Sequence, residues 1–253
     1  MTNKAIGNAL FIYYILTTVA KKTGFTPVYP IGKDYTEKSN GQRYQQLNTG
    51  FYIPIKQQKI SALQDQISHQ FKEKKDNIFD PSIFDIKDGT NISGYFQNLS
   101  YYKEGMQLAF QTEVLSHAYY IFNKFEINSE NCVGVHIRRG DYLKVDRHPV
   151  LPMEYYGKAM SHFDNHQFLV ISDDYEWVKN NFNYKNCHII PSNKNAFIDL
   201  CAFSLCAHQI IANSSFSWWG ASLNKNIDKK VVAPDNWSKG RKMNIVPQEW
   251  IKL

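Results

Sequence analysis

The stretch Cys132-Val133-Gly134-Val135-His136-Ile137 decides the fold of the second half of the chain. Apart from His136 it is a short, uninterrupted run of small or β-branched apolar residues, which predicts a strand buried on both faces. Arg138-Arg139-Gly140-Asp141-Tyr142 follow at once. In an open α/β sheet, ligands bind beyond the carboxyl ends of the strands, so these charged residues stand where a ligand is expected.

The same texture continues to the end of the chain. Further strands are predicted at Phe168–Ser172, Cys187–Pro191, Gln209–Ala212 and Val231–Ala233, with helices at 154–163, 174–182, 196–207 and 215–225. Short apolar strands that alternate with helices indicate a parallel sheet with helices on both faces. The second half is therefore predicted to be a Rossmann-like α/β domain.

The first half is more polar and less regular. We expect a buried amphipathic helix at 8–22 that ends at Gly24, a surface helix at Gln64–Lys75, a short strand or turn at Gly94–Gln97 and a helix within 103–125. The change of texture predicts two domains, 1–130 and 131–253. Trp237, Pro247 and Trp250 should anchor the tail 234–253, which we expect to pack back on the N-terminal domain.

Composition narrows the classes of function. The chain has 253 residues, 43% hydrophobic and 21% charged, with a net charge of +6. This charge admits nucleic acid, anionic lipid or a phosphate-bearing ligand as partner. The lysines are scattered, and Arg138-Arg139 are the only adjacent arginines. A nucleic-acid surface would show clustered basic residues with interleaved aromatics, so nucleic acid is not an expected partner.

Cysteine spacing and the N-terminus bear on location. The four cysteines form no CxxC pair, which predicts reduced thiols rather than a zinc or disulfide framework. The apolar stretch Ala5–Ala20 resembles a signal peptide, but polar residues dilute it and it is shorter than the roughly 20 residues that span a bilayer. We expect a cytoplasmic protein with at most peripheral association with the inner membrane.

The first motif, around Arg138 and Arg139, suits an anionic ligand. A guanidinium matches two phosphate oxygens at once, His136 offers a ring donor or a stacking face, and Asp141 can orient an arginine or act as a base. A surface cluster of salt bridges is the alternative. The position of the arginines at a strand end, beside a buried histidine, favours the ligand.

The second motif is Val170-Ile171-Ser172-Asp173-Asp174, in which a strand ends in a polar turn. Ser172 or Asp173 could simply be the N-cap of the next helix. Asp173 and Asp174 could instead accept hydrogen bonds from a base or a ribose. A metal site is less favoured, because two adjacent carboxylates rarely chelate an ion without a third ligand.

The third motif is Ile210-Ile211-Ala212-Asn213-Ser214-Ser215-Phe216-Ser217-Trp218-Trp219-Gly220, in which a strand leads through small polar residues into a helix. A helix N-terminus offers free N–H groups and a positive dipole end, which suit an anion. Hydroxyl groups of the serines add donors. Trp218 and Trp219 could wall a sugar pocket or pack the helix onto the sheet.

Taken together, HIRRGDY, ISDD and IIANSSFSWWGASLN resemble the three main motifs of the bacterial α-1,2-fucosyltransferases. GYFQ at 94–97, YY at 155–156, VAPDNW at 232–237 and PQEW near the end also match. The resemblance is close over 94–253 and loose over 6–24. At the N-terminus Gly7 and Asn8 match a glycine-rich loop of the family, but Ala9 stands where the family has glutamine.

This resemblance implies two facing Rossmann-like domains (GT-B type), with 1–130 on the acceptor side and 131–253 binding the donor. It implies inverting transfer of L-fucose from GDP-β-L-fucose to O2 of a terminal β-galactoside, without a metal or cofactor. The candidate catalytic residues are Arg138, Asp141 and Asn8. The candidate donor-binding residues are His136, Arg138, Arg139, Asp173, Asp174, Asn213, Ser214, Ser215, Phe216 and Ser217. The acceptor-side candidates are Tyr142, Asp146, His148 and Trp218.

Three alternatives stay open at this point. One is a related glycosyltransferase with another nucleotide sugar or another acceptor. A second is an inactive relative that still binds a GDP-sugar. The third is a non-catalytic binder of nucleotide or nucleic acid, which the scattered lysines disfavour.

Overall fold

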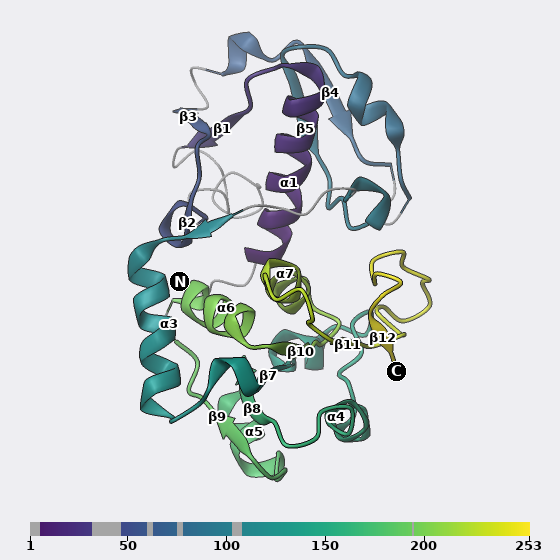
Figure 1. Ribbon diagram of the computed structural model, residues 1–253. Coiled ribbons are helices and arrows are strands. Elements are labelled where there is room, and N and C mark those ends of the chain that lie inside the picture. The colour runs from purple at the N-terminus through teal and green to yellow at the C-terminus, as the bar shows by residue number, and fades with distance from the viewer. Residues whose placement is uncertain (1–5, 32–46, 60–62, 75–77, 103–107, 194) are drawn as a thin grey trace. The chain divides into compact units, whose positions relative to one another are not determined.

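The computed structural model describes residues 6–31, 47–59, 63–74, 78–102, 108–193 and 195–253 (Figure 1). The chain divides into two compact units, Lys4–Ala109 and Phe110–Leu253. Within the described residues, no helix combines the length and the apolar character that crossing a membrane requires.

In its described residues, the N-terminal unit contains the long helix α1 and two small parallel sheets of two strands each, and β2 pairs with β6 at the unit boundary. Strand β1 pairs with β3, and β4 pairs with β5. Its regular elements are α1 (Ile6–Thr23), β1 (Val28–Ile31), β2 (Phe51–Tyr52), β3 (Lys56–Lys59), β4 (His69–Lys72) and β5 (Thr90–Ser93), and β6 (Ala109–Phe110) spans the boundary.

Helix α1 confirms the helix predicted at 8–22 and begins two residues earlier. Ten of its residues are buried, including Leu10, Phe11 and Ile15, so its stability comes from packing rather than from exposed polar pairs. Gly24 ends the helix as predicted. It has a left-handed φ of 77°, and its N–H donates to the Ala20 carbonyl at 2.8 Å.

The surface helix predicted at Gln64–Lys75 is wrong over 64–74, and Lys75 lies outside the described residues. The segment forms a single 3₁₀ turn, Gln64–Gln66, followed by strand β4. The backbone of β4 pairs with Thr90–Ser93, a partner some twenty residues away that local periodicity cannot reveal. In 103–125, residues 103–107 lie outside the described part, and the helix α3 begins at Thr112 and ends at Lys124.

The C-terminal unit confirms the predicted parallel α/β sheet. Six strands pair in the order β12-β11-β10-β7-β8-β9, all parallel. The strands are β7 (Cys132–Ile137), β8 (Gln167–Ser172), β9 (Cys187–Ile189), β10 (His208–Ile210), β11 (Val231–Ala233) and β12 (Ile251–Lys252). Its other helices are α4 (Met153–Met160), α5 (Tyr175–Asn181), α6 (Ala196–Leu205) and α7 (Ser215–Leu223).

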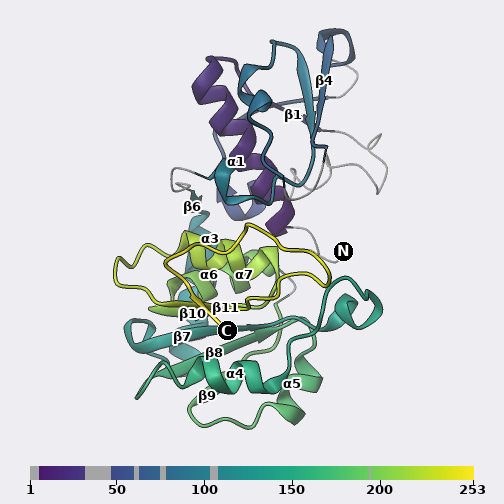
Figure 2. The same cartoon turned by 90° about the vertical axis from the view of Figure 1, so that its right-hand side faces the viewer.

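Helices cover both faces of this sheet. Helices α3, α6 and α7 lie on one face, and α4 and α5 lie on the other (Figures 1 and 2). Strand β7 lies in the middle, between β10 and β8, and all six of its residues are buried. Its central place explains why this stretch reads as a continuous apolar run.

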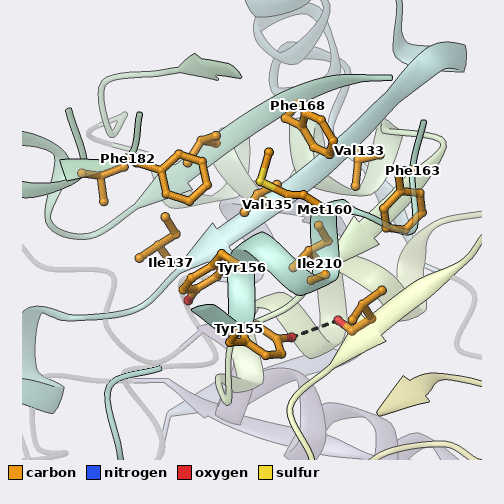
Figure 3. Packing of buried hydrophobic residues seen from close by; sticks show 14 residues of the cluster. Val133, Val135, Ile137, Tyr155, Tyr156, Met160, Phe163, Phe168, Phe182 and Ile210 are labelled. Atoms are coloured by element: carbon orange, nitrogen blue, oxygen red, sulfur yellow. Dashed lines mark hydrogen bonds between the residues drawn. The ribbon is translucent and has the colours of Figure 1, made fainter. Parts of the chain in front are cut away.

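The core on the α4 side of the sheet joins β7 to helix α4 (Figure 3). Val133, Val135 and Ile137 of the strand share this core with Tyr155 and Tyr156 of the helix. Tyr155 donates its hydroxyl hydrogen to the carbonyls of Ile211 at 2.7 Å and Val232 at 3.3 Å, which satisfies a buried polar group. The YY pair at 155–156 thus acts as a structural anchor.

The boundary between the two compact units differs from the predicted domain boundary. The boundary lies at 109/110 rather than 130/131, because α3 packs against α6 of the C-terminal unit. The end of the tail forms β12 beside β11, and Trp250 is buried against Trp218 with their rings 5.9 Å apart. The tail therefore completes the C-terminal sheet.

Candidate active site

The three motifs converge at the carboxyl edge of the C-terminal sheet. Strand β7 pairs in register with β8 on one side and with β10 on the other. Their carboxyl ends therefore bring Arg138, Asp173 and Ser214 to the same edge of the sheet, which is where parallel α/β sheets bind ligands.

Arg138 is held by two carboxylates. Its Nη2 donates to Asp141 Oδ1 at 2.6 Å, and its Nη1 lies 3.1 Å from Asp173 Oδ2. Asp173 also accepts the Arg139 backbone N–H on its other oxygen, Oδ1, at 2.9 Å. The Arg138 side chain is only 14% exposed, so these charge-assisted bonds fix the guanidinium at a partly buried site.

Arg139 points to a different set of partners. Its Nε lies 3.3 Å from Asp174 Oδ2, and its guanidinium stacks on the Trp177 ring at 3.4 Å from the ring centre. Asp174, rather than Ser172 or Asp173, is the N-cap residue of α5, and it donates its backbone N–H to Ser172 Oγ at 3.0 Å. The two arginines are therefore not equivalent: Arg139 stacks on Trp177 of α5, whereas Arg138 follows the end of β7 and pairs with Asp141 and Asp173.

His136 is a buried neutral donor or acceptor at the end of β7. Burial, with a smaller contribution from the Arg138 charge, lowers the pKa of His136 to about 3. Its ring centre lies 5.0 Å from that of Phe216 in the first turn of α7. Among the described residues, its Nδ1 has no hydrogen-bond partner. A buried polar atom of this kind is suited to a ligand.

The N-terminus of α7 is available for an anion. Ser214 is the N-cap residue, and its side chain makes no capping hydrogen bond to the helix. The first N–H groups of a helix have no partner within the helix, and the dipole makes this end positive. Ser215 and Phe216, in the first turn, are only partly buried. The contact between His136 and Phe216 ties this helix end to β7.

Tyr142 and His148 line the same region. The Tyr142 hydroxyl donates to the Asn213 carbonyl at 2.9 Å, and its ring stacks on His148 with centres 4.9 Å apart. Burial raises the pKa of Tyr142 to about 12 and lowers the pKa of His148. Both groups are therefore neutral near pH 7. The Asn213 amide donates to the carbonyls of Pro149 and Trp237, at 3.0 and 3.3 Å.

Three predicted site residues have other partners in the structure. The Ser217 hydroxyl is fully buried, 3.3 Å from the carbonyls of Ala212 and Ser214. Trp218 is 4% exposed, and its indole N–H donates to the Ile245 carbonyl at 2.6 Å, which agrees with packing rather than with a sugar-pocket wall. The Asp146 side chain is 87% exposed and pairs with Lys239 at 2.6 Å.

Asn8 belongs to the N-terminal unit. It lies in the first turn of α1, and its Oδ1 accepts a hydrogen bond from Gln97 Nε2 at 2.9 Å. Gln97 ends the GYFQ string, so the two N-terminal segments that resemble the family's motifs meet within this unit. Glu73 holds the backbone of this string, because its Oε2 accepts the backbone N–H groups of Tyr95 and Phe96 at 2.8 and 2.9 Å.

Sequence reasoning missed two residues of the C-terminal unit. Trp177 was not singled out, although it lies three residues after Asp174 in the predicted helix. Asp199 is 3% exposed and accepts from the side chain of Asn193 at 2.6 Å. A single carboxylate within the apolar run Ala196–Leu205 is the signal that could have revealed it.

Residues 54–253 match the model of glycosyl transferase family 11. The O-antigen biosynthesis glycosyltransferase WbnK of Escherichia coli is 34% identical over 66% of this chain and 62% of its own length. An alpha-1,2-colitosyltransferase of Escherichia coli is 33% identical over 66% of this chain and 64% of its own. The chain thus spans less than two thirds of these relatives.

Two crystal structures resemble the chain in fold. The selenomethionine form of the fucosyltransferase NodZ from Bradyrhizobium has a TM-score of 0.53 and 15% identity, covering 85% of this chain and 87% of NodZ. NodZ alpha-1,6-fucosyltransferase co-crystallized with GDP gives a TM-score of 0.53 at 15% identity, covering 85% and 88%. This likeness confirms the predicted α/β fold of the GT-B type. The match over 54–253 establishes membership: the chain belongs to glycosyl transferase family 11.

Proposed function

We propose that the chain transfers L-fucose from GDP-β-L-fucose to O2 of a terminal β-galactoside, with inversion at the anomeric carbon. The observation that carries this proposal is a convergence at one edge of the sheet. Arg138 lies there with the N-terminus of α7, which Ser214 does not cap through its side chain, and with Nδ1 of His136, which has no hydrogen-bond partner in the part of the chain that the structure describes. These groups together suit a diphosphate.

The leaving group explains why such a site is needed. When the bond from fucose to the β-phosphate breaks, negative charge grows on the diphosphate, and preorganised donors lower the barrier most. Arg138 supplies a fixed positive charge, and the first turn of α7 supplies backbone N–H groups and the Ser215 hydroxyl. Because its pKa is lowered to about 3, His136 stays neutral and can add a hydrogen bond without changing its charge. This donor set supports transfer without a metal.

Donor recognition beyond the phosphates falls to the second motif. Asp173 and Asp174 follow β8 directly and carry acceptor oxygens at the same edge of the sheet. We assign them to hydrogen bonds with the base or ribose, and in addition to the orientation of the two arginines. Ser214 and Asn213 shape the loop beneath the phosphates, and Ser217 and Trp218 hold α7 in place.

The transfer is a single displacement at C1 of fucose. The acceptor O2 forms a bond to C1 of fucose, the bond from C1 to the β-phosphate oxygen breaks, and GDP leaves with the electron pair. The proton of the acceptor hydroxyl passes to a carboxylate, for which Asp141 is the first candidate. Its side chain is 43% exposed and therefore reachable. Tyr142 and His148 lie beside it as neutral acceptor contacts, and Asn8 is proposed to position a substrate from the N-terminal unit.

The relatives favour one alternative substrate. One is named an alpha-1,2-colitosyltransferase, and colitose is fucose without its 3-hydroxyl group. Transfer of this 3,6-dideoxy sugar through the same linkage is therefore the second candidate. WbnK is named for O-antigen biosynthesis, which suggests a glycan repeat as acceptor, built at the cytoplasmic face with at most peripheral membrane contact.

A donor and acceptor panel tests the proposal. The protein is incubated in EDTA with GDP-fucose or the GDP-linked 3,6-dideoxy sugar, and with lactose or lacto-N-biose, and the product linkage is determined by NMR. We expect an α-1,2-fucosylated galactoside. A product only from the dideoxy sugar supports the second candidate. GDP binding with no product from any pair indicates a different acceptor or an inactive relative, and failure to bind GDP contradicts both candidates.

A further inference from the structure

We infer that Asp141 competes with the donor diphosphate for Arg138, and that donor binding releases the Asp141 carboxylate for the acceptor. The inference rests on the proposed function, because it names how the two substrates depend on each other at that site. In this inference, one ion pair controls the order in which donor and acceptor bind. That pair joins Arg138 Nη2 to Asp141 Oδ1 at 2.6 Å.

The two carboxylates on Arg138 differ in how firmly they are held. Asp173 is anchored through both oxygens, to Arg138 at 3.1 Å and to the Arg139 backbone N–H at 2.9 Å, and its side chain is 23% exposed. Asp141 accepts a hydrogen bond from Arg138 through Oδ1, and its side chain is 43% exposed. Asp141 is therefore the partner that can leave at lower cost.

The donor diphosphate and Asp141 use the same N–H group of Arg138, the one on Nη2. The guanidinium binds phosphate best when two N–H groups meet two oxygens. Nη1 is directed to the anchored Asp173, while Nη2 is directed to Asp141, and the Arg138 side chain is only 14% exposed. Among the described residues Nε of Arg138 has no hydrogen-bond partner, so a phosphate that binds two oxygens through the Nε and Nη2 edge meets Asp141 at Nη2. Asp173 stays in place and keeps the guanidinium oriented.

The exchange changes what Asp141 can do. While Arg138 Nη2 donates to Asp141 Oδ1, that oxygen is occupied by the arginine. Once the diphosphate has taken Nη2, both Asp141 oxygens become available to a sugar hydroxyl. The site is thus built to accept the acceptor sugar productively only after the donor is bound.

Calorimetric titration of GDP into the wild-type protein and Asp141→Asn tests the competition. The variant keeps the shape of the side chain but loses the charge. We expect GDP to bind the variant about tenfold more tightly, since one charge-assisted bond no longer has to be broken. We also expect kcat to fall at least a hundredfold while KM for the donor falls. Loss of a merely structural contact would raise KM instead.

Two comparisons keep the result interpretable. Asp228→Asn removes the same charge from an exposed loop ahead of β11 and should leave GDP affinity within about twofold of wild type. In an Arg138→Ala background, Asp141→Asn should raise GDP affinity little, because the guanidinium for which Asp141 and GDP compete is absent. A gain that persists in full there would show simple charge repulsion and overturn the inference.

Failure of this inference is separable from failure of the proposed function. Wild-type protein that binds GDP, together with an Asp141→Asn variant whose affinity is unchanged or weaker, overturns the competition and leaves the proposed function standing. A melting temperature within a few degrees of wild type shows that the variant is folded. Should Asp141→Asn fail to fold, Asp141→Glu replaces it: the longer side chain should disturb the pair and still raise GDP affinity, and an unchanged or lower affinity overturns the inference.

Discussion

A Cβ atom at Gly140 would lie 2.3 Å from Asp173 Oδ2, the same oxygen that lies 3.1 Å from Arg138 Nη1. The glycine of the Arg-Arg-Gly-Asp string is therefore explained by the second motif. It leaves the space through which the Asp173 carboxylate reaches Arg138 and the Arg139 backbone, so a side chain at residue 140 would displace that carboxylate.

Replacement of Gly140 by alanine should damage the site without unfolding the sheet. The new methyl group must push Asp173 away, which removes one support of Arg138. We expect GDP affinity to fall about tenfold, corresponding to ~1.4 kcal/mol of binding free energy. Titration of GDP and a thermal melt measure the two effects. Because the loop is partly exposed, the melting temperature should change little.

Gly24→Ala provides the control for backbone strain. Gly24 has a φ of 77° and open space around its Cβ position, and it lies in the N-terminal unit. This variant should lose about 1 kcal/mol of stability and keep GDP affinity. If Gly140→Ala binds GDP as well as wild type does, Asp173 does not need the space that Gly140 leaves.

The serines of the third motif should separate into two roles. Ser217 is buried with its hydroxyl against backbone carbonyls, so Ser217→Ala should cost about 1 kcal/mol of unfolding free energy and leave GDP affinity intact. Ser215 lies partly exposed in the first turn of α7, so Ser215→Ala should weaken GDP binding about threefold to tenfold with stability unchanged. Urea unfolding and GDP titration on both variants check this, and the reverse pattern would exchange the assignments.

Asp199 should give the protein a pH-dependent stability. Burial raises the pKa of Asp199 from 3.8 to about 6, against the opposing hydrogen bonds from Asn193 and Ser192. Since the folded pKa is above the unfolded one, this group contributes stability that is fully present below the unfolded pKa and is lost as pH rises through about 6. Asp199→Asn cannot titrate, so the stability of wild type relative to the variant should fall between pH 4.5 and 7.5.

Urea unfolding midpoints at pH 4.5, 6 and 7.5 measure this difference. The neighbouring Asn195→Ala serves as a second variant, since it removes the N-cap hydrogen bond to the Phe197 N–H without removing a titrating group. Its difference from wild type should not change with pH. A constant difference for Asp199→Asn as well would mean that Asp199 does not titrate in this range.

Much of the C-terminal fold is predictable because its strands are buried on both faces. β7 and β11 lie at their predicted bounds, since each is a short apolar run that pairs on both sides. β12 was missed because two residues carry no pattern, and only its pairing with β11 defines it. The helix predicted at Gln64–Lys75 was wrong for the same reason, because β4 is defined by its pairing with the distant strand β5.

The site was predictable in its motifs but not in its pairings. Placing Arg138 and Asp173 at strand ends needed only the strand pattern, and adjacent parallel strands then brought them together. Which oxygen each arginine meets, and that Trp177 stacks on Arg139, depends on loop conformations that sequence spacing does not fix. Burial of Trp218 likewise depends on Trp250 and Ile245, which lie far along the chain.

Titration of GDP and of guanosine into wild type and Arg138→Lys tests the central claim most directly. Lysine keeps the charge but loses the fork, so we expect GDP to bind the variant at least tenfold more weakly and guanosine to bind both proteins equally. That pattern places Arg138 on the diphosphate. Equal GDP affinity in the two proteins, or an equal loss for guanosine, would contradict it.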